Sequence, residues 1–274
     1  MYTPCKELDA VLEDYAQKLN HILKGNLAGV YLQGSLAIGD FDMTSDVDFV
    51  VVVNNELTDK EVGHIQEIHD RVYEQDNRWV KRLEYSFFPK QKINDASSPF
   101  ENGRENSGEE RKLWYFDNGS KKIEKSDHDN TLVVRWILRE KGIALIGPSP
   151  KEFIKPISPN DLRKEIRETM LGWGKQLIED ASPFRNRFYQ SFIVLNFSRM
   201  LHDLHTGRVS SKLEAVKWAS NELDTEWAQL IDFCWKERED TSISVKQPAN
   251  DEVFSKSIEF VAYTLEKADN YRIC

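Results

Sequence analysis

Residues 34–49 read Gly-Ser-Leu-Ala-Ile-Gly-Asp-Phe-Asp-Met-Thr-Ser-Asp-Val-Asp-Phe, and this stretch decides the fold of the chain. The apolar segment 27–32 precedes it and predicts a strand that ends where the stretch begins. Residues 46–53 predict a second strand, because every residue after Asp48 is apolar, as in a strand covered on both faces. Asp46 and Asp48 stand two residues apart at its start, so their carboxylates share one face.

The residue types in this stretch indicate a phosphate and metal site. Two carboxylates on one face repel each other unless a cation lies between them. Mg²⁺ binds oxygen ligands and commonly uses one or two carboxylates together with substrate phosphates. The Gly34-Ser35 pair can bring backbone N–H groups and a hydroxyl close to a phosphate, because glycine lets a backbone approach closely. Taken singly, Asp-x-Asp and Gly-Ser are both common in turns and strand entries.

A third carboxylate follows on the next expected strand, 80–88, which alternates between polar and apolar residues. Glu84 faces away from its apolar neighbours Leu83 and Tyr85. If this strand pairs beside the second strand, all three acids meet at one site. The order of strand, Gly-Ser, spacer, Asp-x-Asp, apolar strand, helix and acid-bearing strand is much more specific than any of its members.

The rest of the sequence predicts an α/β domain over residues 1–155, with a small mixed sheet and flanking helices, and an all-α helical bundle over residues 156–274. Residues 90–127 are polar apart from Trp114-Tyr115-Phe116, and we interpret them as a long surface excursion. Apolar residues at spacings of three and four predict the helices of the second domain. The expected helices are 4–23, 58–74, 129–141, 159–180, 184–206, 210–222, 225–238 and 252–270, with a further strand over 143–146.

Composition and charge restrict the class of protein. Hydrophobic residues make up 40% of the 274 residues, enough for a sizeable core. No apolar run approaches the ~20 residues of a membrane span, and the three cysteines are too far apart for a disulfide framework or a zinc site. The net charge of −9 argues against a broad nucleic-acid surface and suits a small cationic partner. We expect a cytoplasmic, monomeric protein that does not associate with membranes.

Gly34-Ser35 followed by Asp46 and Asp48 resembles the signature of the nucleotidyltransferase superfamily. Within it, the chain is similar to the aminoglycoside adenylyltransferases that act on streptomycin and spectinomycin. The resemblance covers most of residues 25–90 and 130–220. Further matching segments are Arg82-Leu83-Glu84, Ala144-Leu145-Ile146-Gly147-Pro148, Asn196-Phe197-Ser198-Arg199, Thr206-Gly207-Arg208, Ser211-Lys212 and Trp218-Ala219.

The resemblance implies a nucleotidyltransferase domain followed by a helical domain. It implies transfer of AMP from ATP to a hydroxyl of a small polyhydroxylated acceptor, an aminoglycoside. Asp46 and Asp48 would hold one or two Mg²⁺ ions, and Glu84 would act as general base and contact the acceptor. The residues implied to contact ATP are Gly34, Ser35, Ser45 and Lys212.

Other residues allow two interpretations each. Trp114 would line the acceptor pocket as a stacking wall, or it anchors the excursion to the core. Arg199 would pair with an acid at the domain interface, or it would reach ATP. Tyr189 stands where the family carries an acid thought to contact the drug.

Two alternative functions are also compatible with the motif. One is a nucleotidyltransferase that modifies a protein or RNA acceptor, as in toxin–antitoxin pairs. The other is a catalytically idle nucleotide-binding module. The intact set of Asp46, Asp48 and Glu84 favours an enzyme over the idle module.

Overall fold

The computed structural model describes residues 1–95, 99–101, 104–106 and 108–271. The chain divides into two compact units. The first is formed by the described residues of 1–41, 45–97 and 107–156, and the second by those of 42–44, 98–106 and 157–274. The short segment around Phe100 groups with the second unit because Phe100 packs against Gly172 of the helical region.

In the described part of the first unit, six strands form one sheet in the order β7-β6-β3-β2-β1-β8. β2 and β3 run parallel, and the other neighbouring strands run antiparallel. This confirms the mixed sheet expected from the sequence. Its strands are β1 (Leu27–Leu32), β2 (Val47–Val53), β3 (Leu83–Pro89), β6 (Leu113–Phe116), β7 (Glu124–Ser126) and β8 (Ile143–Ile146), while β4 (Phe100–Glu101) and β5 (Arg104–Glu105) pair separately.

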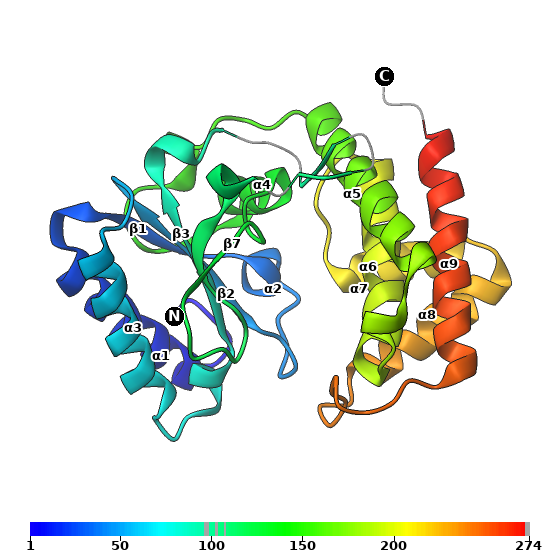
Figure 1. Ribbon diagram of the computed structural model, residues 1–274, viewed down its shortest axis with the longest axis horizontal. Helices are drawn as coiled ribbons and strands as arrows, with labels where there is room; N and C mark the ends of the chain where they lie inside the picture. Colours follow the sequence, from blue (N-terminus) through cyan, green and yellow to red (C-terminus); the bar gives the residue numbers. More distant parts are fainter. Residues whose placement is uncertain (96–98, 102–103, 107, 272–274) are drawn as a thin grey trace. The chain divides into compact units, whose positions relative to one another are not determined.

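Helices pack on both faces of this sheet (Figure 1). A parallel pair of strands needs a crossover, and α3 (Asp59–Tyr73) supplies it between β2 and β3. It begins with a capping box formed by Thr58 and Glu61. The other helices of this unit are α1 (Lys6–Leu23), α2 (Gly34–Ile38) and α4 (Leu132–Lys141), with 3₁₀ turns at Lys24–Asn26, Arg78–Lys81, Lys90–Lys92, Glu109–Arg111 and Pro150–Glu152.

Alternate residues of the central strands enter two separate hydrophobic clusters. One cluster lies beneath α1 and α3 and includes Phe49 of β2 and Phe87 of β3. The other lies beneath α4 and includes Val50 of β2 and Phe88 of β3. This separation follows from the two-residue period of a strand, and it decides which side chains share a face at the strand ends.

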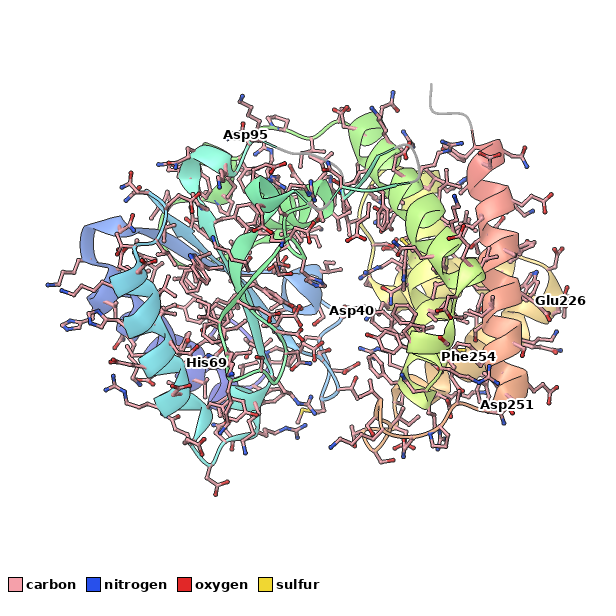
Figure 2. The ribbon with its side chains drawn as sticks, viewed as in Figure 1. Asp40, His69, Asp95, Glu226, Asp251 and Phe254 are labelled. Atoms are coloured by element: carbon pink, nitrogen blue, oxygen red, sulfur yellow. The ribbon has the colours of Figure 1, made fainter. Side chains whose placement is uncertain are left out.

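A buried polar network joins α1, α3 and β3. His69, labelled in Figure 2, is 1% exposed, and its Nδ1 lies 3.0 Å from the Tyr85 hydroxyl and 3.3 Å from the Tyr15 hydroxyl. The two hydroxyls also hydrogen-bond each other, and Nε2 of His69 lies 3.0 Å from the main-chain oxygen of Ser120. Burial lowers the pKa of His69, so the folded protein keeps its imidazole neutral at pH 7.

Two expectations for the first domain were wrong in detail. The third strand begins at Leu83 and not at residue 80, because Arg78–Lys81 forms a 3₁₀ turn. The excursion 90–127 is not merely a surface loop, since β6 and β7 extend the sheet beyond β3. Pairing with β3 fixes this strand conformation, and the partner of a short aromatic run cannot be identified from the run itself.

The helical second unit confirms the bundle expected from the sequence. α6 packs against α5, α7, α8 and α9 and supplies buried residues along most of its length. Ser158, Asn186, Ser211 and Asn250 cap the starts of four of these helices with their side chains. The helices are α5 (Pro159–Glu179), α6 (Arg187–Thr206), α7 (Lys212–Glu222), α8 (Thr225–Arg238) and α9 (Asp251–Asn270), with a 3₁₀ turn at Ser182–Phe184. Among the described residues, no helix is long and apolar enough to cross a membrane.

Candidate active site

The strand starts that carry Asp48 and Glu84 lie next to each other in the sheet. β2 and β3 run parallel, and their register pairs Asp48 with Glu84. The strand neighbours Val47 and Leu83 are buried in the cluster beneath α1 and α3, so both acids project from the opposite face. The strand pairing expected from the sequence is therefore confirmed, and Asp46 directly precedes β2. We call this side of the sheet the acid face.

Gly34 brings the main chain against Asp48. It starts α2 with a φ of +55°, a left-handed conformation that residues with side chains rarely adopt. A side-chain carbon added there would overlap Oδ2 of Asp48 and would lie 2.7 Å from its Cγ, where ordinary contacts begin at 3.4 Å. The preceding Gln33 donates its N–H to the main-chain oxygen of Asp48 at 2.9 Å. The Gly-Ser and Asp-x-Asp motifs therefore touch, and the contact requires glycine.

Two donors reach one oxygen of Glu84. The Tyr115 hydroxyl donates to Oε1 at 2.7 Å and has a longer alternative acceptor, Oδ1 of Asp117, at 3.1 Å. Nε2 of His128 lies 3.2 Å from the same Oε1. Tyr115 is 4% exposed and the Glu84 side chain 14%, whereas the His128 side chain is 61% exposed. The contact with Glu84 raises the pKa of His128, and burial, followed by the Glu84 charge, raises the pKa of Tyr115. Near neutral pH both groups keep the protons that they donate to the carboxylate.

Asp129 ties the segment before α4 to the sheet. It is 4% exposed and accepts hydrogen bonds from the Ser86 hydroxyl at 2.7 Å and from Nε2 of Gln33 at 3.3 Å. Burial raises the pKa of Asp129, while its donors favour the charged form. Between β6 and β7, Nδ2 of Asn118 donates to Oδ1 of Asp46 at 2.5 Å. The segment from β6 to α4 thus supplies neighbours for acids on both β2 and β3.

Trp114 lies on the other side of the sheet. β6 pairs with β3 so that Trp114 stands opposite Phe87, and its ring packs on the cluster beneath α1 and α3. Nζ of Lys125 lies 4.4 Å from the centre of the indole ring. Because neighbouring strand residues face opposite sides, Tyr115 and not Trp114 reaches the acid face. This packing favours the interpretation of Trp114 as an anchor, and its contact with the acceptor stays a prediction.

The two serines assigned to nucleotide contact both precede the Asp-x-Asp motif. Ser35 follows Gly34 in α2, and its main-chain oxygen accepts the N–H of Gly39 at 2.9 Å. Ser45 is 6% exposed, and its main-chain oxygen accepts a hydrogen bond from Arg82 at 3.2 Å. Arg82 immediately precedes β3. Both serines therefore lie on segments whose main chains are held close to the strand starts.

Lys212 and Arg199 belong to the helical unit. Lys212 is the first residue of α7, and its Nζ lies 5.5 Å from the centre of the Phe192 ring. Arg199 donates to Oδ1 of Asn196 within α6 at 3.1 Å. Tyr189, one turn before Phe192, packs edge-on against that ring with centroids 5.5 Å apart. An aromatic surface therefore stands where the resemblance places an acid.

Asp46 and Asp48 fit Mg²⁺ by the chemistry of their donors. Both offer hard carboxylate oxygens at the start of one strand, and the contact with Gly34 fixes where Asp48 lies. Within the described ranges, no group of three or more His, Cys, Asp or Glu residues has the arrangement of a complete metal site.

Sequence reasoning missed Tyr115, Asn118 and His128 as neighbours of the acids. Tyr115 could have been found had the Trp-Tyr-Phe run been interpreted as a strand beside β3, since alternation then puts it on the acid face. Asn118 and His128 carry no comparable signal. Their positions depend on the path of the chain through β7, which is three residues long and largely exposed.

Two family models match the chain. Residues 12–115 match the nucleotidyltransferase domain, and residues 152–266 match the C-terminal domain of aminoglycoside adenylyltransferase. The first match contains the strands that carry the acids, and the second contains all or most of each helix of the bundle.

Curated relatives and a solved structure agree with these matches. A spectinomycin 9-adenylyltransferase of Staphylococcus aureus is 27% identical over 219 residues, which is 77% of each chain. An aminoglycoside (3'') (9) adenylyltransferase of Rhizobium radiobacter is 32% identical over 93 residues, covering 34% of this chain and 32% of that protein. The fold is similar to the crystal structure of a spectinomycin adenyltransferase from Enterococcus faecialis with ATP and spectinomycin, at a TM-score of 0.66 and 18% identity, over 95% of this chain and 98% of the other.

Proposed function

Since this chain is a nucleotidyltransferase that resembles the aminoglycoside adenylyltransferases, we propose that it transfers AMP from ATP to a hydroxyl of an aminoglycoside-type antibiotic. Spectinomycin is the first acceptor to test. The spectinomycin relative aligns over 77% of the chain, whereas the (3'') (9) relative aligns over only 34%. Tyr189 of α6, in place of the acid that the resemblance assigns to the drug, also indicates an acceptor site that differs from the family's.

One observation carries this proposal. Asp48 and Glu84 are register partners on one face of the sheet, with the main chain of Gly34 against Asp48. A single face thus presents a carboxylate for a cation, a backbone that can approach a phosphate, and a second carboxylate for a proton. Nucleotidyl transfer needs these three functions close together, because its catalysis is mainly positioning and charge neutralisation.

The proposed reaction assigns a role to each residue. Asp46 and Asp48 would hold Mg²⁺, which neutralises charge on the triphosphate when bound. Glu84 takes the proton of the acceptor hydroxyl, whose oxygen forms a bond to the α-phosphorus as the bond to pyrophosphate breaks. The products are the adenylylated acceptor and pyrophosphate. Gly34, Ser35 and Ser45 would contact the phosphates through main-chain N–H and hydroxyl groups, and Lys212 would supply a further positive charge.

Pyrophosphate release tests this assignment directly. Purified protein is mixed with ATP, Mg²⁺ and a panel of spectinomycin, streptomycin and other aminoglycosides. We expect release with one or more drugs and its loss in Glu84→Gln. Glu13→Gln, on the exposed side of α1, is the matched control and should keep the full rate.

The binding of ATP separates the remaining outcomes. Protein that is silent across the panel but melts at a higher temperature with ATP and Mg²⁺ would redirect the search to a protein or RNA acceptor. Protein that is silent and shows no such shift would overturn the proposed function and leave only the fold.

A further inference from the structure

Two side chains from outside β3 contact the Glu84 carboxylate. The Tyr115 hydroxyl and Nε2 of His128 lie 2.7 Å and 3.2 Å from the same oxygen, Oε1. The two donor rings also pack together, with centroids 5.4 Å apart and an interplanar angle of 32°. The three side chains come from β3, from β6 and from the segment before α4. We call Tyr115 and His128 the Glu84 clamp.

Sheet pairing and a buried neighbouring residue hold the two clamp side chains in place. Tyr115 stands opposite Ser86 in the β3–β6 ladder, so its position is set by sheet pairing. His128 is followed by Asp129, which is buried and bound to the Ser86 hydroxyl at 2.7 Å and to Gln33 at 3.3 Å. Donors that are fixed in this way can hold a carboxylate in one orientation, as side chains on rigid elements do in precise sites.

The charges around His128 favour its donor role. The charges of Asp129 and Glu84, and more weakly that of Asp48, favour protonated His128, and the uncharged Tyr115 ring packs beside it. An ion pair in open water contributes little to the free energy of folding. Here the Glu84 side chain is only 14% exposed, and a second, buried donor binds the same oxygen. The two donors therefore control the orientation of the Glu84 carboxylate.

We propose that Tyr115 and His128 are positioning residues that orient the Glu84 carboxylate to take the proton of the acceptor hydroxyl. This inference rests on the proposed function, because it assigns a task only if Glu84 is the base. A general base must lie within hydrogen-bond reach of the proton that it removes, so its orientation enters the rate directly. Neither clamp residue takes the proton in this assignment.

The contact itself can be tested without catalysis. A titration of the histidine resonances by NMR, with His128→Gln to assign the signal, should show His128 titrating well above the ordinary value near 6.5. Glu84→Gln should bring this titration down by at least one pH unit. The resonance of His64, exposed on α3, serves as the reference signal. A His128 titration that is ordinary in the wild type and unchanged in Glu84→Gln would overturn the proposal.

Kinetics then test the positioning role. Tyr115→Phe and His128→Ala each remove a donor to a charged group, and we expect kcat to fall roughly 10- to 100-fold. KM for ATP should stay within about twofold, because neither residue is assigned to the nucleotide. His128→Gln, which retains an N–H donor, should recover part of the loss. The double variant should lose less than the product of the single losses, since both act through one carboxylate.

The outcomes distinguish this inference from the proposed function. Active wild-type protein with fully active Tyr115→Phe and His128→Ala variants would overturn the clamp and leave the proposed function intact. Wild-type protein that is inactive with every acceptor and is not stabilised by ATP and Mg²⁺ would overturn both, whatever the NMR titration shows. Tyr263→Phe on α9 is the matched control for removal of a hydroxyl and should change neither kcat nor KM.

Discussion

Gly34→Ala is the sharpest test of how the two motifs meet. The added methyl would overlap Oδ2 of Asp48 and approach its Cγ to 2.7 Å, where ordinary contact begins at 3.4 Å. The Asp48 carboxylate must therefore move. A displacement on the order of 1 Å in a catalytic group can cost roughly 100-fold in rate, and we expect a loss of that size in pyrophosphate release.

The same substitution also strains the backbone. Gly34 has a φ of +55°, and a left-handed conformation costs a residue with a side chain roughly 1–2 kcal/mol. In a chain of this size, that corresponds to a fall in melting temperature of roughly 2–8 °C. The strain alone would leave the protein folded at the assay temperature, so any loss of rate beyond it reports on the site.

Gly39→Ala is the matched control for that strain. Gly39 ends α2 with a φ of +94°, and a side-chain carbon added there would meet nothing within 4 Å. It should show a similar fall in melting temperature while keeping the rate and the stabilisation by ATP and Mg²⁺. A Gly34→Ala protein with wild-type rate and ATP stabilisation would refute the argument. Equal losses of rate in both variants would assign the effect to backbone strain.

Three further predictions concern the sheet and its two faces. Trp114→Ala should lower the free energy of unfolding in urea by about 2 kcal/mol, because the ring packs on the cluster beneath α1 and α3. The substitution should leave KM for the acceptor unchanged. A raised KM at unchanged stability would contradict this placement. Ser86→Ala removes the 2.7 Å donor of buried Asp129 and should cost roughly 1–3 kcal/mol, measured in the same assay, and a neutral result would show that Asp129 finds another donor. Burial lowers the pKa of His69 in the folded state, so its contribution to stability is present above about pH 6.5 and is lost as the pH falls. The melting temperature of the wild type should therefore drop more between pH 7.5 and 5.5 than that of His69→Gln. If the melting temperatures of both proteins fall in parallel with pH, His69 is not the cause of the pH dependence.

The sequence was most informative where one local pattern sufficed. The apolar run after Asp48 identified β2, and alternation placed Glu84 away from Leu83, as the structure confirms from Leu83 onward. The helices of the bundle were also predicted correctly, because each buries a periodic apolar stripe and several begin with a capping side chain. These features depend on residues close together in the chain.

The features that the sequence did not predict depend on pairing between residues that are distant in the chain. β6 has only four residues, with no polar alternation, and it becomes a strand by pairing with β3. Asn118 reaches Asp46 across 72 positions of sequence, and His128 reaches Glu84 by a similar return of the chain. Neither residue type marks such a contact in advance. The roles assigned to Ser45, Lys212 and the acids stay predictions until the variants are measured.

The short ladder between β6 and β3 has a consequence for how the acceptor preference of such a protein could change. Only three residue pairs fix its register. A slip by one residue would exchange the faces of Trp114 and Tyr115, removing a hydroxyl from Glu84 and placing an indole ring beside it. Such a slip would thus change the surroundings of Glu84, which we propose contacts the acceptor, while β2 and β3 keep their own pairing.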